Sequence, residues 1–328
     1  MKTVSRPLLI GLLLAALVLL SLASLSAGKV WIPWNAWFAA ADDLRSIIVF
    51  ELRLPRTVLG IIVGAALGLT GAAMQGYTRN PLADPGILGV SSMAAFGAVV
   101  TMYFGALTTL PWLLPVGAMI GAVGGIAALL ALSGAASSIL TFVLAGMILN
   151  TVATAGVSLA LNLAPTPWAV NEIVNWLLGS LADRSVDEVR MALPFVLIGS
   201  VLVMMLARPL DALTLGETGA RSLGIDLGRT RVLLALGVGI SVGASVAVTG
   251  VIGFVGLVTP HLLRPLVGAR PGALLLPSAL AGAVIVLAAD VLVRLLPSVA
   301  ELKLGVAMAG VGAPFFLALL INVRRRAV

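Results

Sequence analysis

The stretch LTLGETGARSLGIDLGRTR, from Leu213 to Arg231, is the longest hydrophilic interruption in the second half of a mostly apolar chain. Apolar segments lie directly on both sides of it, which predicts a polar loop between two membrane spans. Thr214 and Glu217 have the spacing of a capping box, and Gly224 followed by Ile225 is typical of a left-handed helix stop. We therefore expect a short helix here. Spacing alone favours an ordinary solvated loop, so the rest of the chain must decide its role.

The composition is that of a membrane protein. Of the 328 residues, 60% are hydrophobic and 10% are charged, and the mean hydropathy is +1.16. Soluble domains carry charge on about a quarter of their residues. The absence of cysteine excludes disulfides, thiolate metal ligands and cysteine nucleophiles. A formal charge of +7 does not indicate nucleic-acid binding, because the basic residues are scattered and form no patch with interleaved aromatics.

Polar or Pro/Gly-rich breaks divide the chain into about ten apolar segments of roughly 17 to 24 residues, the length that crosses a bilayer. They predict an all-α, polytopic fold with one transmembrane domain over residues 1–328. The first segment could instead be a cleaved signal peptide, but its length and the spans that follow favour a membrane helix. The segments lie at approximately 8–27, 54–76, 86–104, 112–132, 138–161, 191–207, 231–250, 252–267, 273–295 and 304–323.

The basic residues predict the orientation of these segments, because cytoplasmic loops are enriched in lysine and arginine. If the amino terminus is cytoplasmic, both termini and the Leu213–Arg231 loop fall on the side with more basic residues. The basic residues on that side are Lys2, Arg6, Arg79, Arg208, Arg221, Arg229, Arg231, Arg264, Arg270, Arg324, Arg325 and Arg326.

Residues that could carry chemistry are few. His261 is the single histidine, and without a partner motif it builds neither a serine protease site nor a metal site. An ion-coupled transporter needs buried ionisable groups, and the one candidate, Asp290, has Arg294 four residues later as a structural partner. The three lysines do not follow a glycine-rich turn, so the chain has no ATP-binding Walker A loop. Energy must therefore come from a partner, and Leu213–Arg231 is the place for that partner to act.

Three arginines, Arg53, Arg56 and Arg294, fall by this topology at the external ends of spans. They oppose the positive-inside trend and so require an explanation. One alternative is contact with lipid headgroups. The other is a basic surface for an acidic external partner.

Several runs of the chain, in order, resemble the permeases of type II ABC importers for iron-siderophores, haem and cobalamin. One departure is Lys303, where that family commonly has proline, and it affects the external mouth. The runs are LRLPRTVLGIIVGAALGLTGAAMQGYTRNPLADPGILGVS (52–91), LGETGARSLGI (215–225), TGVIGFVGLVTPHLLRPLVG (249–268), LLLPSALAGAVIVLAADVLVR (274–294) and GAPFFLALL (312–320).

The resemblance implies roles for particular residues. Within a cytoplasmic coupling loop at 208–231, a coupling helix would seat in the ATPase. Arg53, Arg56 and Arg294 match positions that engage acidic residues of a binding protein. Asn80 and Leu82 match a cytoplasmic gate that meets the fifth span at Ser138 and Thr141. The coupling residues are Leu215, Gly216, Glu217, Gly219, Ala220, Arg221, Leu223 and Gly224.

The resemblance also implies partners: a second permease copy or a homologous permease, two cytoplasmic ATPases that bind ATP and Mg, and a periplasmic or lipid-anchored binding protein. The chain itself is expected to be no enzyme and to hold no cofactor or metal, in the inner membrane of a bacterium. We expect it to import an intact metal chelate, with a ferric siderophore preferred and haem or cobalamin as alternatives. An ion-coupled secondary transporter and a membrane scaffold stay open as other classes.

Overall fold

The computed structural model describes residues 5–38, 43–104, 110, 112–134, 138–268, 270–297 and 301–327. Every regular element in these ranges is a helix, which confirms the all-α prediction. In chain order the elements are α1 (Arg6–Ser26), η1 (Trp34–Phe38), α2 (Leu44–Ile47), η2 (Ile48–Arg53), α3 (Leu54–Thr78), η3 (Pro85–Leu88), α4 (Val90–Tyr103), α5 (Leu113–Ser133), α6 (Ile139–Asn162), α7 (Pro167–Leu177), α8 (Val186–Met204), α9 (Ala207–Leu213), α10 (Gly216–Ser222), α11 (Leu227–Thr249), α12 (Val255–Val267), α13 (Pro271–Leu295) and α14 (Leu304–Ala327).

Each of the ten predicted apolar segments overlaps one of the longer helices, namely α1, α3, α4, α5, α6, α8, α11, α12, α13 or α14. In the described part of the chain, six helices are long and apolar enough to cross a membrane. A seventh span forms if α8 and α9, which meet at a 44° bend, are taken together. The helices α4, α12 and the first part of α14 are apolar but shorter.

Two predicted spans begin later than expected. The segment predicted at 86–104 becomes helical only at Val90, and the one predicted at 252–267 only at Val255. The residues before these starts, Gly89 and Phe254, have φ values of 73° and 67°. A right-handed helix cannot include such left-handed backbone, so each helix begins after it.

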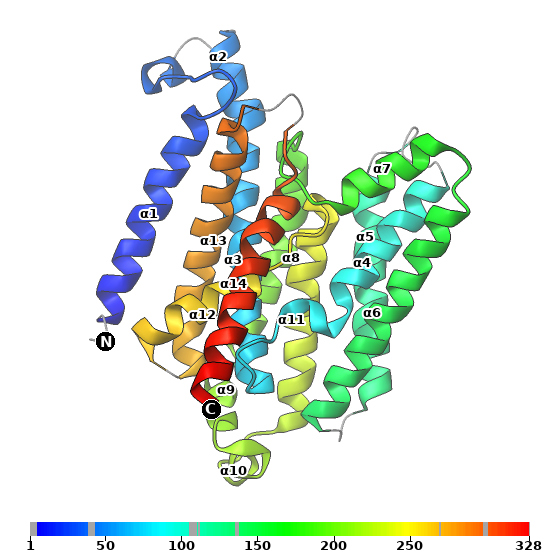
Figure 1. Ribbon diagram of the computed structural model, residues 1–328, viewed down its shortest axis with the longest axis vertical. Helices are drawn as coiled ribbons and strands as arrows, with labels where there is room; N and C mark the ends of the chain where they lie inside the picture. The colour runs from blue at the N-terminus through cyan, green and yellow to red at the C-terminus, as the bar shows by residue number, and fades with distance from the viewer. Residues whose placement is uncertain are drawn as a thin grey trace.

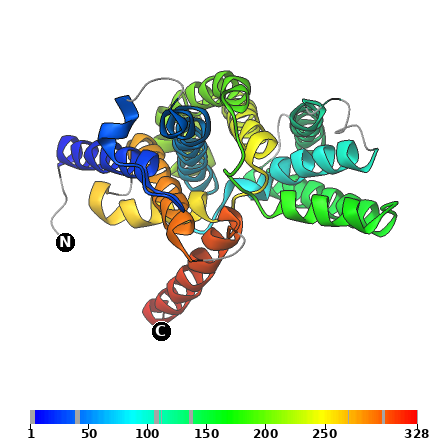
Figure 2. The same cartoon turned by 90° about the horizontal axis from the view of Figure 1, so that it is seen from above.

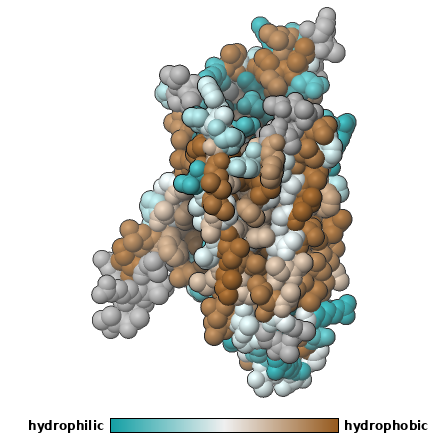
Figure 3. All heavy atoms as spheres, turned by 90° about the vertical axis from the view of Figure 1, so that its right-hand side faces the viewer, coloured by the Kyte–Doolittle hydropathy of each residue, from teal (hydrophilic) through white to brown (hydrophobic). Residues whose placement is uncertain are grey.

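The bundle has two polar ends. Figure 1 places α10 together with the start of α1 and the end of α14, and places α2 and α7 at the opposite end. We call these the α10 end and the α7 end. Between them, the face in Figure 3 is largely apolar, and hydrophilic residues gather toward both ends. The shared position of α10 and the two ends of the chain agrees with the predicted topology. Lys2 lies outside the described residues, as do the side chains of Arg324, Arg325 and Arg326.

The centre of the bundle is α3, which packs along α13 and also contacts α8, α11 and α12. Glycines let α3 and α13 approach closely. A Cβ atom at Gly64 would lie 2.5 Å from the carbonyl oxygen of Gly282, and one at Gly68 would lie 2.1 Å from that of Ser278. Both distances are far below van der Waals contact, so these positions require glycine. Close approach of this kind holds membrane helices together where lipid provides no hydrophobic driving force.

A second group, α4, α5 and α6, packs on itself and is joined to the centre by α11. Seen from above in Figure 2, this group lies to one side of the molecule, and α1, α12 and α13 lie to the other. In the same view α14 projects away from the bundle. In this view α14 and the α4–α6 group therefore point in different directions from the centre of the bundle.

Candidate coupling, pathway and docking sites

The predicted loop at 208–231 contains most of α9 and all of α10, two short helices at the α10 end. The predicted left-handed stop is confirmed: Gly224 has φ 79°, and the Ile225 amide donates to the carbonyl of Ala220 at 3.1 Å. The last residues of the predicted loop at 208–231 belong instead to α11, which begins at Leu227 because Asp226 caps its first turn. Arg231, predicted as a loop base, is thus buried in a helix and is only 3% exposed.

The predicted capping box at Thr214 and Glu217 is wrong. Leu215 occupies the N-cap position of α10 and makes no side-chain capping bond. The hydroxyl of Thr214 donates back to the carbonyl of Asp211 at 2.6 Å. The carboxylate of Glu217 accepts from the backbone amide of Ile139, the first residue of α6, at 3.3 Å. Glu217 therefore reaches to another helix rather than to its own.

The surface of α10 is suited to protein contact. Ala220 is fully buried and fixes the helix against the bundle. Leu215 and Leu223 are 67% and 62% exposed, and Arg221 lies between them in sequence. Arginine is enriched among the residues that carry binding energy at protein interfaces, and the exposed leucines on either side of Arg221 add apolar surface that a partner can cover. The other predicted coupling residues, Gly216, Glu217, Gly219 and Gly224, lie within or at the ends of the same helix.

The four predicted gate residues fall into two turns. Ser138 caps α6, because its hydroxyl accepts from the amide of Thr141 at 3.2 Å. The side chain of Asn80 likewise accepts from the amide of Leu82 at 3.0 Å, in the turn that follows α3. The connection after this turn packs on α6 at Gly146, where an added Cβ would lie 2.3 Å from the carbonyl oxygen of Ile87. The gate role stays a prediction: what the structure packs on α6 is the connection that follows the Asn80–Leu82 turn.

A cavity of about 570 Å³ lies within the bundle. Its wall is mostly apolar, and its polar lining residues are Asp84, Ser91, Ser92, Asn150, Ser245 and Thr249. Ligand sites have this volume and this mixture of apolar wall and few polar groups.

Two segments between the long helices also line this cavity: 84–87, most of which belongs to the short 3-10 helix η3, and the non-helical residues 250–253 after α11. The second segment runs inward through the bundle. It starts beside the α7–α8 connection, where the Ser180 amide donates to the carbonyl of Thr249, and it ends where Gly256 packs on Gly71 in the middle of α3. In a membrane protein, non-helical backbone at such depth is tolerated where it is buried in protein or lines a cavity.

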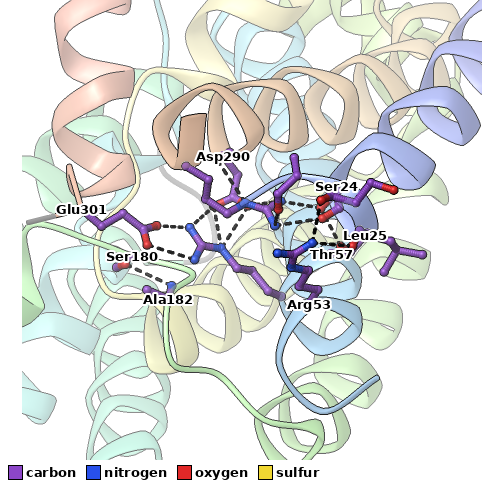
Figure 4. Close-up of polar contacts among 12 residues, drawn as sticks. Ser24, Leu25, Arg53, Thr57, Ser180, Ala182, Asp290 and Glu301 are labelled. Atoms are coloured by element: carbon purple, nitrogen blue, oxygen red, sulfur yellow. Dashed lines mark hydrogen bonds and ion pairs between the residues drawn. The ribbon is translucent and has the colours of Figure 1, made fainter. Parts of the chain in front are cut away.

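The three predicted docking arginines line one pocket at the α7 end. Figure 4 shows one of them, Arg53, beside Ser24 and Leu25 at the end of α1. Arg53 donates to the carbonyls of Leu25, Ser26 and Val30 at 2.6 to 2.9 Å. Arg294 donates to the carbonyl of Ser24 at 2.9 Å and to its hydroxyl at 2.5 Å. The carbonyls of Ser24, Leu25 and Ser26 have no partner within α1 because they end the helix.

Asp290 holds the cluster together. It is fully buried and pairs with Arg56 at 2.8 Å and with Arg294 at 2.9 Å, so the predicted pairing of Asp290 with Arg294 is confirmed. The outer face of Arg56 pairs with Glu301, whose side chain is 32% exposed. All three arginines are less than 10% exposed. Neither alternative from the sequence, headgroup contact or an open basic surface, anticipated this internal pairing; the docking role itself stays a prediction.

A pocket of about 220 Å³ opens above the cluster. Five basic and two acidic side chains line it, so its mouth is positively charged: Lys29, Arg53, Arg56, Arg184, Arg294, Asp183 and Glu301. Burial lowers the pKa of the Arg184 guanidinium from its ordinary value, and Glu188 and Asp183 oppose that shift. An arginine stays charged at physiological pH under such shifts, so the pocket attracts anionic groups.

The fold and its sites define a polytopic membrane permease. The model of the FecCD transport family matches residues 14–322, and the chain belongs to this family. Its members are permeases of ABC importers, in which partner ATPases hydrolyse the ATP, so the chain is not itself an enzyme. The family resemblance found in the sequence is therefore confirmed.

Similar proteins extend over nearly the whole chain. The vitamin B12 import system permease protein BtuC of Klebsiella pneumoniae is 40% identical over 324 residues, covering 98% of this chain and 96% of the relative. The uncharacterised ABC transporter permease YvrB of Bacillus subtilis is 39% identical over 320 residues, covering 92% and 90%. A solved structure described as a metal-chelate type ABC transporter in an inward-facing conformation aligns with a TM-score of 0.87 and 34% identity, covering 96% of this chain and 99% of that one.

Proposed function

We propose that the chain is one of two permeases in an importer that carries an intact metal chelate across the bacterial cytoplasmic membrane, powered by ATP on partner subunits. The observation that carries this proposal is the cavity of about 570 Å³, which has non-helical backbone and polar side chains in its wall. A membrane helix bundle that only anchors partners has no use for such a space. The α10 end is then the cytoplasmic side, as the basic residues predict.

A pair of permeases fits the polar residues that α6 exposes. Asn150, Thr151, Thr154 and Ser158 are exposed in the single chain, and polar side chains of this kind avoid lipid. A second copy packed on this part of α6 would enclose the exposed polar residues in a shared pathway. One coupling helix in each chain also matches two ATPases in a symmetric assembly. The partner copy is this same chain or a homologous permease.

Two of the similar proteins support a choice of cargo. The vitamin B12 permease in Klebsiella pneumoniae is 40% identical to the chain, which supports a corrinoid as the first cargo to test. The aligned metal-chelate type transporter supports the wider class, which includes the ferric siderophore preferred from the sequence. The single histidine and the lack of cysteine give the pathway few groups that bind a bare metal ion. The metal is therefore proposed to cross still wrapped in its ligand.

The pocket at the α7 end supports docking of an acidic binding protein. It presents five basic side chains, and Arg56 faces it together with Glu301. An incoming carboxylate would compete with Glu301 for the outer face of Arg56, whereas Asp290 would keep the inner face. Of the three predicted docking arginines, Arg56 is thus the one that can change partner. Arg53 and Arg294 support it by fixing the end of α1.

The proposed cycle uses two states. ATP binding closes the partner ATPases, their movement displaces α10, and the helices around the cavity reorient between an external and a cytoplasmic opening. The test is uptake into proteoliposomes that contain the permease, the ATPases and the binding protein. Labelled cobalamin, a ferric siderophore, haem and free ferric ion are compared, with a hydrolysis-deficient ATPase as the control.

We expect ATP-dependent uptake of one of the chelates and none of the free ion. Uptake of free ferric ion without uptake of any chelate would overturn the proposal. In a separate arm the permease alone receives a proton gradient. Transport in that arm would favour a secondary transporter.

A further inference from the structure

The side chain of Glu217 connects α10 to the start of α6. Its Oε1 atom accepts from the Ile139 amide at 3.3 Å, and its Oε2 atom lies 3.9 Å from Arg221. Ile139 begins α6, where backbone N–H groups lack partners within the helix. A carboxylate at this position is also stabilised by the helix dipole. The contact thus joins the proposed ATPase-binding helix to a long membrane helix.

A second set of contacts fixes this region to the centre of the bundle. Arg231 on α11 donates to the hydroxyl of Tyr77 on α3 and to the carbonyl of Gly134 at the end of α5, each at 3.1 Å. Its guanidinium also lies over the ring of Phe142, 5.9 Å from the centroid. Phe142 is in the first turn of α6 and meets Tyr77 edge to face. The start of α6 is therefore held by α3 and α11 on one side and by α10 on the other.

The helix that these contacts hold is a wall of the cavity. Val143, Met147 and Asn150 of α6 line it, and their spacing places them on one face of the helix. The first of them follows Phe142 directly. A displacement of the start of α6 would therefore change the shape of the cavity and the position of Asn150 in its wall.

We propose that Glu217 is a positioning residue that passes the movement of α10 to α6, while Arg231, Tyr77 and Phe142 form the fixed point about which α6 moves. This inference rests on the proposed function, because it assumes that ATPases act on α10. Glu217 suits the role because its side chain is only 25% exposed and turns toward α6. Arg221 is 62% exposed and is left to face the partner.

The test compares Glu217→Ala, Glu217→Gln and the control Thr218→Ala in the complete reconstituted importer. Thr218 is the next residue of α10 and is exposed. For Glu217→Ala we expect about tenfold fewer molecules imported per ATP hydrolysed, because one hydrogen bond with a charged partner is lost. The affinity of the permease for the ATPases should stay within about twofold, since the Glu217 carboxylate is largely covered and turns toward α6. Glu217→Gln keeps an acceptor oxygen and should recover most of the coupling, and Thr218→Ala should behave as the wild type.

A second measurement follows the contact itself. Amide hydrogen exchange over residues 138–144 is recorded for the full-length permease without partners. We expect faster exchange in Glu217→Ala and no change in Thr218→Ala.

Three results would overturn the inference: unchanged import per ATP in Glu217→Ala, a loss of ATPase affinity that accounts for all of the lost uptake, or unchanged exchange. If the wild-type importer shows no ATP-driven uptake, the proposed function fails instead. The exchange measurement then still decides whether Glu217 holds the start of α6.

Discussion

The two polar ends of the molecule are built in opposite ways. At the α7 end, three arginines and Asp290 are buried, and their hydrogen bonds join α1, α3 and α13. At the α10 end, α10 carries exposed leucines and one ion pair at 3.9 Å, and it reaches α6 through Glu217. Many buried contacts make a rigid junction, whereas few and exposed ones can be remodelled by a partner. We infer that the cluster of Arg53, Arg56, Asp290 and Arg294 at the α7 end, which we call the clamp, stays rigid. Movement is then transmitted into the permease at the α10 end.

The largest expected effect is at the clamp. Asp290→Ala leaves Arg56 and Arg294 without their shared carboxylate in a buried site, which should cost about 3–5 kcal/mol of unfolding free energy. The measurement is thermal unfolding of the permease in detergent, followed by tryptophan fluorescence. Asp183→Asn, which removes an exposed negative charge from the same pocket, is the control, because asparagine tolerates the left-handed backbone of Asp183 (φ 57°). Equal melting temperatures for the two variants would contradict a clamp centred on Asp290.

The next effect concerns the surface of α10. Leu215→Asp replaces a leucine that we expect to be buried in the ATPase, and burial of a leucine contributes about 1.5–3 kcal/mol. The affinity for the ATPase subunit should therefore fall at least about tenfold, as measured by interferometry on permease in nanodiscs. Leu302→Asp, an exposed leucine near the opposite end, should leave this affinity unchanged. The same loss in both variants would show that α10 is not the contact.

A smaller effect, on the affinity for the binding protein, is expected at Glu301, which pairs with Arg56 at the outer edge of the clamp. Glu301→Gln frees the outer face of Arg56, so the affinity for the binding protein should rise about two- to fivefold at low ionic strength and less at high salt. Glu51→Gln removes the same charge from an exposed site of η2 and is the matched control. A lower affinity in Glu301→Gln would mean that Glu301 contacts the binding protein rather than competing with it.

The smallest expected effect is that of Arg221→Ala. Like Arg294, Arg221 lies four residues after an acidic residue of its own helix, but its ion pair is exposed. Arg221→Ala removes an exposed pair with Glu217, so the unfolding free energy should change by less than about 0.5 kcal/mol. Arg294→Ala, which removes a buried pair and the bonds to Ser24, should lower the melting temperature clearly. Similar melting curves for the two variants would remove the contrast between the two ends.

Much of the fold could be predicted from the sequence, because membrane helices need long apolar runs and these are visible residue by residue. The pairing of Asp290 with Arg294 follows from their spacing on one helix. The starts of α4 and α12 could not be predicted, because Gly89 and Phe254 take left-handed conformations that the neighbouring structure imposes. Apolar composition alone does not distinguish such backbone from helix.

The sites were less predictable, because their partners are distant in the chain. The partner of Glu217 lies 78 residues away in the chain, and a capping rule considers only residues within one helical turn. Arg53 donates hydrogen bonds to carbonyls at the end of α1, an interaction that depends on where that helix ends. An arginine at the predicted external end of a span indicates a structural or functional role. The sequence does not distinguish a side chain that faces a partner from one that caps the end of a helix.

The central claim is tested by distances within one permease during the ATP cycle. Because the chain contains no cysteine, spin labels can be placed at introduced cysteines alone. One pair, at Leu140 and Arg270, reports α6 against α13 at the α10 end, and the other, at Leu52 and Leu296, reports the clamp. Labelled permease is diluted with unlabelled permease in the complete importer, and distances are compared without nucleotide and with ATP on a hydrolysis-deficient ATPase. We predict a shift in the Leu140–Arg270 distance and a constant Leu52–Leu296 distance; a shift confined to the clamp, or none at the α10 end, would contradict the account.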